Sequence, residues 1–198
     1  MFRTTLKSGL RNFWKNKSYS FLNILGLAIG IACAGLIFLW VEDETTFNRV
    51  HVKKDRIYLV MNNWPFSQHF STYDNTPGLM GPAMKTEIPG IANACRMTEG
   101  QSTQLIRIGN KSIYANGVYA DSSMFSMFTI PFAQGNAGDA FKQIHSMVIT
   151  EKAARKFFGN DRNVMGRTVR LNNKQDYRIT GVIKDLPENN TIRFEWLV

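Results

Sequence analysis

Cysteine and histidine are scarce in this sequence, which limits the sites it can build. The two cysteines, Cys33 and Cys95, are too few for a disulfide framework, and we interpret both as small buried apolar residues. The three histidines, His51, His69 and His145, lie far apart and show neither the His-x-x-x-His nor the His–Cys spacing of metal ligands. We therefore expect no metal site.

The sequence also lacks the common nucleotide-binding and catalytic motifs. It contains no G-x-x-x-x-G-K-[ST] loop for ATP phosphates and no G-x-S-x-G turn for a nucleophilic serine. We interpret the acidic residues 42–44 as a solvated flank and Asp185 with Glu188 as part of a turn, the alternative in each case being a paired-carboxylate site. We expect no catalytic residue and no cofactor, so the chain is not predicted to be an enzyme; an anchored hydrolase remains an alternative.

The positive charge is unevenly distributed along the chain. The sequence has 24 Lys and Arg against 15 Asp and Glu, a formal net charge of +9. Five of these cations precede residue 18 with no acid among them: Arg3, Lys7, Arg11, Lys15 and Lys17. A basic cluster beside an apolar run is typical of a membrane surface, so we expect membrane lipid and no nucleic acid as a partner.

An apolar run from Phe21 to Val41 predicts a transmembrane helix over residues 19–42. The run has 21 residues, which as a helix span roughly 30 Å, the thickness of a bilayer core. Twelve of them are Leu, Ile, Phe or Val, and these favour insertion by roughly 4–7 kcal/mol. The cations upstream and the acids of residues 42–44 downstream place the N-terminus in the cytoplasm and the remainder outside.

Two other interpretations of the apolar run stay open. Ala32-Cys33-Ala34 provides small residues like those of a signal-peptide cleavage site, but the apolar run continues to Val41, which is longer than a signal peptide requires. A buried helix of a soluble protein is the second alternative, although the run has no polar face.

Small residues and cations suggest two further membrane features. Gly26, Gly30 and Ala34 share one helix face, on which another helix could pack closely. Residues 1–18 predict a cytoplasmic interfacial amphipathic helix, because Arg3, Lys7, Arg11 and Lys15 form one stripe beside an apolar arc of Phe2, Leu6, Leu10, Phe13 and Trp14. The alternative is a basic flank without a defined helix.

Residues 43–198 predict an external domain of the α+β class, because strand and helix patterns alternate irregularly with adjacent hairpins. Aromatic residues at Trp64, Phe66 and Phe70 favour core packing beneath a loop, with an exposed contact loop as the alternative. We expect the domain to be incomplete, and a missing strand partner would leave residues 194–198 as an open edge. The expected strands cover residues 56–62, 91–98, 103–108, 112–120, 146–149, 168–171, 177–185 and 193–198, and the expected helices cover 76–87, 121–128 and 151–158.

Three stretches resemble the permease subunits of the MacB/FtsX-like ABC transporter family. Residues 23–60, NILGLAIGIACAGLIFLWVEDETTFNRVHVKKDRIYLV, are similar to the family's first membrane helix and the D-R-I-Y entry to its periplasmic core domain. Residues 120–161, ADSSMFSMFTIPFAQGNAGDAFKQIHSMVITEKAARKFFGND, and 166–198, GRTVRLNNKQDYRITGVIKDLPENNTIRFEWLV, match later segments of that domain in order. Thr191 stands where serine is common in the family.

The resemblance implies a non-catalytic permease subunit of the cell inner membrane. Its expected partners are a cytoplasmic ABC ATPase and other permease helices or a second permease copy. ATP hydrolysis by the ATPase would move the MacB-like periplasmic core domain, for export or extraction of substrate. The family's proteins are longer, which indicates a fragment. The alternative is a single-pass, membrane-anchored external binding module that works without an ATPase.

Overall fold

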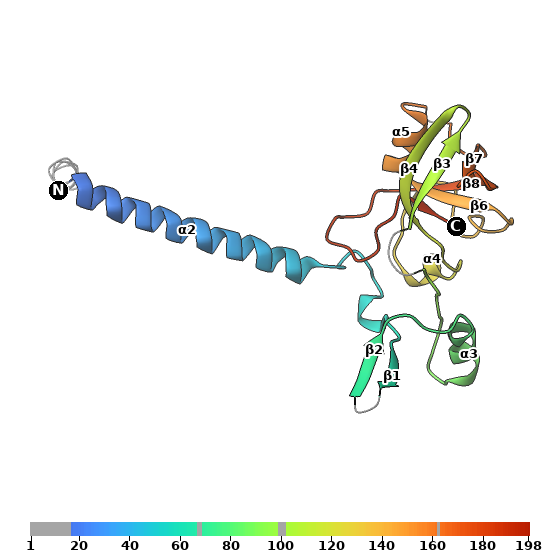
Figure 1. The fold of residues 1–198 in the computed structure, drawn as a ribbon, viewed down its shortest axis with the longest axis horizontal. Helices are drawn as coiled ribbons and strands as arrows, with labels where there is room; N and C mark the ends of the chain where they lie inside the picture. Colours follow the sequence, from blue (N-terminus) through green and yellow to red (C-terminus); the bar gives the residue numbers. More distant parts are fainter. Residues whose placement is uncertain (1–16, 67–68, 99–101, 162) are drawn as a thin grey trace. The chain divides into compact units, whose positions relative to one another are not determined.

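A computed structural model of the chain describes residues 17–66, 69–98, 102–161 and 163–198. It contains two compact units, Met1–Phe47 and Asn48–Val198, which we describe separately. In the first unit, helix α2 (Lys17–Thr46) runs for 30 residues and buries none of them (Figure 1). It contains the whole predicted span and is long and apolar enough to cross a membrane. The predicted interfacial helix lies outside the described residues, except for its last two positions.

A ring of six strands forms the centre of the second unit. The strands are β3 (Ser102–Ile108), β4 (Lys111–Val118), β6 (Ser146–Thr150), β7 (Thr168–Leu171), β8 (Gln175–Ile183) and β9 (Trp196–Leu197). They neighbour one another in the order β8-β6-β9-β4-β3-β7, and the pairing of β7 with β8 closes the ring. The short strand β5 (Phe132–Gln134) adds to β8. With the helices, this arrangement agrees with the predicted α+β class, but closure was not predicted.

The hairpins and the central helix form where the sequence predicts them. Strand β3 pairs antiparallel with β4 across Gly109, and β7 pairs antiparallel with β8 across Asn172 and Asn173, all three with positive φ. Helix α5 (Glu151–Phe158) begins where the Thr150 side chain accepts a hydrogen bond from the Ala153 N–H. Local sequence patterns were therefore enough to predict these elements, without knowledge of tertiary contacts.

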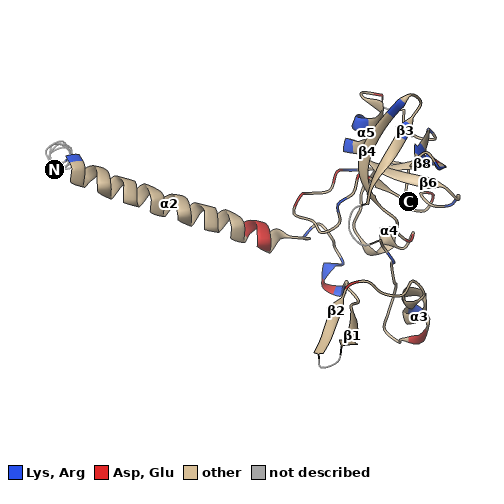
Figure 2. Cartoon of the chain, viewed as in Figure 1, with Lys and Arg blue, Asp and Glu red and all other residues tan. Residues whose placement is uncertain are grey.

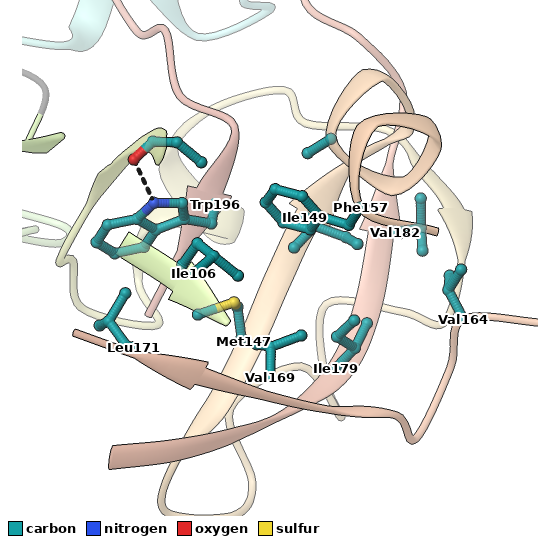
Figure 3. Close-up of a cluster of buried hydrophobic side chains, with 12 residues drawn as sticks. Ile106, Met147, Ile149, Phe157, Val164, Val169, Leu171, Ile179, Val182 and Trp196 are labelled. Atoms are coloured by element: carbon teal, nitrogen blue, oxygen red, sulfur yellow. Dashed lines mark hydrogen bonds between the residues drawn. The ribbon is translucent and has the colours of Figure 1, made fainter. Parts of the chain in front are cut away.

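Two apolar clusters lie on opposite faces of the central strands. On β6, Met147 and Ile149 belong to the first cluster, whereas Val148 between them belongs to the second. The first cluster draws side chains from all six strands of the ring and from α5 (Figure 3). The second includes Met124 of α4 (Met124–Met127) and residues of the segment that leads to β9. Successive side chains of a strand alternate between faces, which produces this division.

Trp196 of β9 belongs to the first cluster and is fully buried (Figure 3). Its indole Nε1–H donates to the Ala115 carbonyl at 3.0 Å, and its ring packs against Gly117 of β4. A β-carbon at Gly117 would lie 1.9 Å from the indole, so only glycine fits there. Strand β9 pairs with β4 on one side and β6 on the other. Strand β9 is therefore not an open edge, because the partner strands that the sequence analysis left open are present in this chain.

The part of the second unit between residues 52 and 105 contributes no buried residue among those described. It contains a two-stranded hairpin, β1 (Asn62–Phe66) with β2 (His69–Tyr73), and helix α3 (Met80–Glu87). Trp64, Phe66 and Phe70 are 54%, 49% and 73% exposed. These aromatic residues lie in the hairpin strands and not beneath a loop in the core, so the favoured interpretation of them is wrong.

Several element boundaries also differ from the prediction. Of the strand predicted over residues 56–62, only Asn62 lies in a strand, because a short 3-10 helix (Lys54–Arg56) and residues 57–61 without regular structure precede β1. The segment 91–98 makes only one isolated bridge, between Met97 and Ala120. Helix α3 begins near Met80, after a turn in which the Met80 N–H donates to the Pro77 carbonyl. The secondary-structure propensities of the residues did not reveal that these segments stay outside paired strands and helices.

Replacing Gly117 by alanine tests the packing of Trp196. We expect Gly117→Ala to lower the free energy of unfolding by about 3 kcal/mol, because the new methyl group overlaps the indole. Gly78→Ala is the matched control, since no atom lies within 4 Å of the added carbon. Denaturant unfolding of the full chain in detergent, followed by near-UV circular dichroism, measures both. Equal midpoints for the two variants would contradict the packing.

Candidate functional site

The junction, defined as residues 48–53 together with residues 126–129 and 189–192, is the candidate functional site. It begins where α2 ends. Asn48 has a φ of 58°, the left-handed conformation that commonly follows the last turn of a helix. Its backbone N–H donates to the Asn189 carbonyl at 3.0 Å. Its side-chain Oδ1 accepts from the Thr191 N–H, and its Nδ2 donates to Thr191 Oγ1 at 2.8 Å. One asparagine thus ends the helix and holds the following segment to a distant loop.

His51 provides the buried centre of the junction. Its side chain is 4% exposed and lies edge-on to the Phe128 ring, with the ring centroids 5.3 Å apart. Nδ1 accepts a hydrogen bond from the Thr129 N–H at 3.2 Å, and Nε2 lies 3.2 Å from Asn190 Oδ1. Asn190 is 1% exposed, and its Nδ2 has no partner in the described structure. Both ring nitrogens therefore connect residue 51 to other parts of the second unit.

Neighbouring contacts strengthen the junction at both ends. The Val52 N–H donates to Thr129 Oγ1 at 3.0 Å, and Lys53 Nζ donates to the Ser126 carbonyl at 2.6 Å. On the loop side, Arg193 donates from its guanidinium to the carbonyls of Asn190 and Glu188. The segment after α2 is therefore held by backbone and side-chain hydrogen bonds from two separate parts of the sequence.

Charge at the last turn of α2 is unusual for a helix end. Residues 42–44 are all acidic, where the helix dipole favours cations (Figure 2). The Thr45 and Thr46 hydroxyls donate to the Glu42 carbonyl at 3.2 and 2.7 Å, so both side chains fold back onto the last turn of the helix. All three acidic side chains are exposed.

The predicted membrane residues all lie on α2 or outside the described residues. Phe21 and Val41 lie within the helix, and no atom lies within 4 Å of a β-carbon built at Gly26 or Gly30. Ala34 is exposed on the same helix, so the packing face stays a prediction. Lys17 is the first residue of α2. The other members of the basic cluster, Arg3, Lys7, Arg11 and Lys15, lie outside the described residues.

The remaining candidate side chains have structural partners or lie apart. Asp185 accepts from the Lys152 N–H at the start of α5 and pairs with Arg155 at 2.8 Å. Cys95 is half-buried against the second cluster, and burial raises the pKa of its thiol. Next to it, Arg96 pairs with Asp121 and thereby lowers the pKa of that carboxyl. Within the described ranges, no three His, Cys, Asp or Glu side chains are grouped to hold a metal ion.

A second feature is an open pocket of about 350 Å³ on one face of the β1–β2 hairpin. Trp64, Phe66 and Tyr73 line it together with the turn of residues 75–77. Directly opposed residues of an antiparallel pair share a face, so the pairings Trp64↔Ser71 and Asn62↔Tyr73 place these aromatic residues together. The pocket walls carry no charged side chain, which suits an apolar ligand surface rather than catalysis.

The junction was not predicted from the sequence. His51 was considered only as a possible metal ligand, and Asn48 was not considered. The available signals were an asparagine directly after an apolar helix, which tolerates the left-handed conformation, and the paired Asn189-Asn190 of the later loop. Neither signal reveals that the two segments meet, because 139 residues separate His51 from Asn190.

Comparison with known proteins gives the chain a family and a set of structural relatives. Residues 20–195 match the family model of the MacB-like periplasmic core domain. A crystal structure of a domain assigned to a permease protein from Porphyromonas gingivalis superposes with a TM-score of 0.57 at 28% identity, covering 66% of this chain and 55% of that one. No curated protein matches the chain.

Two weaker structural matches come from transporters. The periplasmic region of MacB from Actinobacillus actinomycetemcomitans gives a TM-score of 0.45 at 22% identity, over 59% of this chain and 51% of that one. The extracellular domain of the ABC-type transporter YknZ from Gram-positive bacteria gives 0.40 at 18% identity, over 50% of each chain. The chain thus spans about half the length of the solved structures it matches.

Substitutions at Asn48 and Thr191 test the junction. Asn48→Gly keeps the left-handed backbone but removes both side-chain hydrogen bonds, and we expect a loss of about 1–2 kcal/mol in the free energy of unfolding. Thr191→Val removes only the Oγ1 acceptor and is expected to cost about 1 kcal/mol, whereas Thr191→Ser retains the hydroxyl and stays within about 0.5 kcal/mol of the original. Denaturant unfolding in detergent gives all three values. Identical values for Thr191→Val and Thr191→Ser would contradict the contact.

Proposed function

Because the chain belongs to the family of the MacB-like periplasmic core domain, we propose that it is the N-terminal part of an ABC transporter permease. In this proposal the chain is not an enzyme. A separate cytoplasmic ATPase hydrolyses ATP, and this chain converts the resulting movement of membrane helices into movement of a domain outside the membrane, for export or extraction of a substrate.

The junction is the observation that carries the proposal. Helix α2 ends two residues before Asn48, and within the second unit Asn48 and His51 bind residues 189–191 and Thr129 through hydrogen bonds. In the proposal, a displacement of the helix end would pass along the chain to Asn48 and His51 and from them to residues 189–191 and Thr129.

In the proposed topology, α2 crosses the inner membrane once in this chain, with residues 1–18 in the cytoplasm and Asn48–Val198 outside. The uneven charge supports this orientation, because in the sequence the cations precede the apolar run and the acids of residues 42–44 follow it. Gly26, Gly30 and Ala34 would pack against other permease helices or a second permease copy, and Arg3, Lys7, Arg11, Lys15 and Lys17 would contact anionic lipid.

The pocket on the β1–β2 hairpin supports a second candidate function. A membrane-anchored external module that binds an apolar partner, without an ATPase, would use exposed aromatic residues such as Trp64 and Tyr73. The two functions differ in one respect that can be measured, which is whether an ATPase associates with the chain.

Affinity purification of the full chain from detergent-solubilised membranes of its native host tests the first candidate. We expect an ATPase subunit to be recovered with the chain. Gly30→Leu fills the proposed packing face and is expected to reduce this recovery at least about fivefold, a loss of roughly 1 kcal/mol in helix association. Gly35→Leu is the matched control, because Gly35 lies on another face of α2 and is equally unobstructed.

Recovery of the intact chain without any ATPase would refute the permease function and favour the binding module. Equal losses for Gly30→Leu and Gly35→Leu would leave the ATPase association standing but would contradict the assignment of the packing face.

A further inference from the structure

Strands β3, β7 and β8 present an exposed basic face on the outside of the ring. Each of them places apolar side chains in the first cluster, and successive side chains of a strand alternate between faces, so the neighbouring positions point outward. Three of these outward positions are exposed arginines: Arg107, Arg170 and Arg178. On β6 and β9 the positions that point away from the first cluster, Val148 and Leu197, pack in the second cluster. The arginines thus occupy a part of the outer face that remains exposed.

Strand register places the three arginines beside one another. Arg107 lies directly opposite Arg170 in the antiparallel pair of β3 with β7. Arg170 in turn lies opposite Asp176, two residues before Arg178, so Arg178 is its diagonal neighbour on β8. Opposed β-carbons of an antiparallel pair are about 5 Å apart, and like charges at opposed positions destabilise the pair. The fold therefore keeps two cations together at a place where sheet stability alone disfavours them.

Asp176 balances only one of the three positive charges. Arg170 donates to the two oxygens of this carboxylate from Nε and Nη2, at 2.5 and 2.9 Å, and these hydrogen bonds lower the pKa of the carboxyl. Arg107 donates from Nε to the Gly109 carbonyl at 3.3 Å. The ion pairs among the described residues include neither Arg107 nor Arg178. Two guanidinium charges on this face therefore have no described acid beside them.

The geometry of the face suits carboxylates carried by a protein. Asp176 shows how a carboxylate fits, because both of its oxygens are held by one planar guanidinium. On the other side of Arg107, Tyr114 of β4 is its diagonal neighbour and is 67% exposed. Arginine and tyrosine are enriched at protein interfaces. A closed ring is convex on its outside, so a planar bilayer would meet fewer of these side chains at once than a flexible polypeptide would.

We propose that the arginine face, defined as Arg107, Arg170, Arg178 and Tyr114, is a docking surface for an acidic segment of another protein. Carboxylates of the partner bind Arg107 and Arg178 in the way that Asp176 binds Arg170. A carboxylate near Arg107 also offsets the repulsion between the opposed arginines, because it attracts both of them. The attraction is electrostatic, so it favours acidic partners and weakens as salt is added. The face belongs to the second unit alone, and docking does not depend on the proposed coupling to an ATPase.

Site-resolved cross-linking of an acidic peptide to the full chain tests the docking surface. The probe is a deca-glutamate peptide that carries a benzophenone group, and the chain is held in phosphatidylcholine nanodiscs. Mass spectrometry locates the cross-links after irradiation, which separates binding at the arginine face from binding to the five cations before residue 18. We expect saturable cross-links to residues 102–118 and 168–178 whose yield falls as salt is raised.

Paired substitutions show whether the two unbalanced arginines are responsible. Arg107→Gln together with Arg178→Gln is expected to weaken the affinity at the arginine face at least about fivefold. Arg107→Lys with Arg178→Lys keeps both charges but loses the planar forks, and we expect a loss of about threefold. Lys152→Gln with Lys184→Gln is the matched control, since it removes two exposed cations at the start of α5 and just after β8, and its effect is expected to stay below about twofold.

Denaturant unfolding separates docking from a structural role of Arg107. Because Arg107 and Arg170 repel one another, we expect Arg107→Gln to leave the unfolding midpoint unchanged or to raise it. A midpoint that falls together with the cross-linking yield would assign Arg107 to the fold and overturn its role in docking.

Three further outcomes would overturn the proposal. The first is the absence of cross-links at the arginine face, and the second is an equal loss in the glutamine pair and in the lysine control. The third is unchanged peptide affinity in the glutamine pair with weaker binding to phosphatidylglycerol vesicles, which would assign the face to anionic lipid. Full peptide affinity in the Arg→Lys pair would overturn recognition by the guanidinium forks. None of these measurements involves an ATPase, so failure of the docking surface and failure of the proposed function are distinguishable.

Discussion

The position of β9 between β4 and β6 is the constraint on which the candidate site depends. Trp196 fits only beneath Gly117, and its indole hydrogen bond to Ala115 fixes the strand along its own axis. The loop of residues 189–192 lies a few residues before β9, so the position of β9 restricts the position of the loop. Ile192 and Phe194, which pack in the second cluster, restrict it further. Asn48 and His51 bind that loop. The segment after α2 is therefore tied to the apolar core through a short, well-anchored path.

Apolar surface is used in two different ways along the chain. In β3–β9, alternating side chains fill two clusters on the two faces of the strands. In α2 and in residues 52–105, large apolar side chains stay exposed, and this arrangement is typical of surfaces that meet a membrane or another polypeptide. The favoured interpretation of Trp64 as packed in the core beneath a loop was wrong, because β1 and β2 form a separate two-stranded sheet and no described residue of theirs belongs to either cluster.

The sequence predicts those helix ends and turns that depend on residues close together in the chain. Thr150 and Gly159 mark the two ends of α5, and Gly109 and Asn172 mark the two hairpin turns, because caps and positive φ depend on neighbouring residues only. It does not predict the closure of the ring or the neighbours of β9, which require contacts between residues far apart in the sequence. The junction belongs to the second kind. Asn48 and Thr191 are ordinary polar residues until the fold brings them within 2.8 Å.

Hydrogen bonds define the geometry of the junction more closely than apolar packing would. Apolar contacts are not directional and permit sliding, whereas the contacts of Asn48 and His51 depend on both distance and angle. The two ring nitrogens of His51 lie 3.2 Å from two different segments, at the Thr129 N–H and at Asn190 Oδ1. One buried side chain therefore connects three parts of the sequence, which an apolar residue at position 51 could not do through directional contacts.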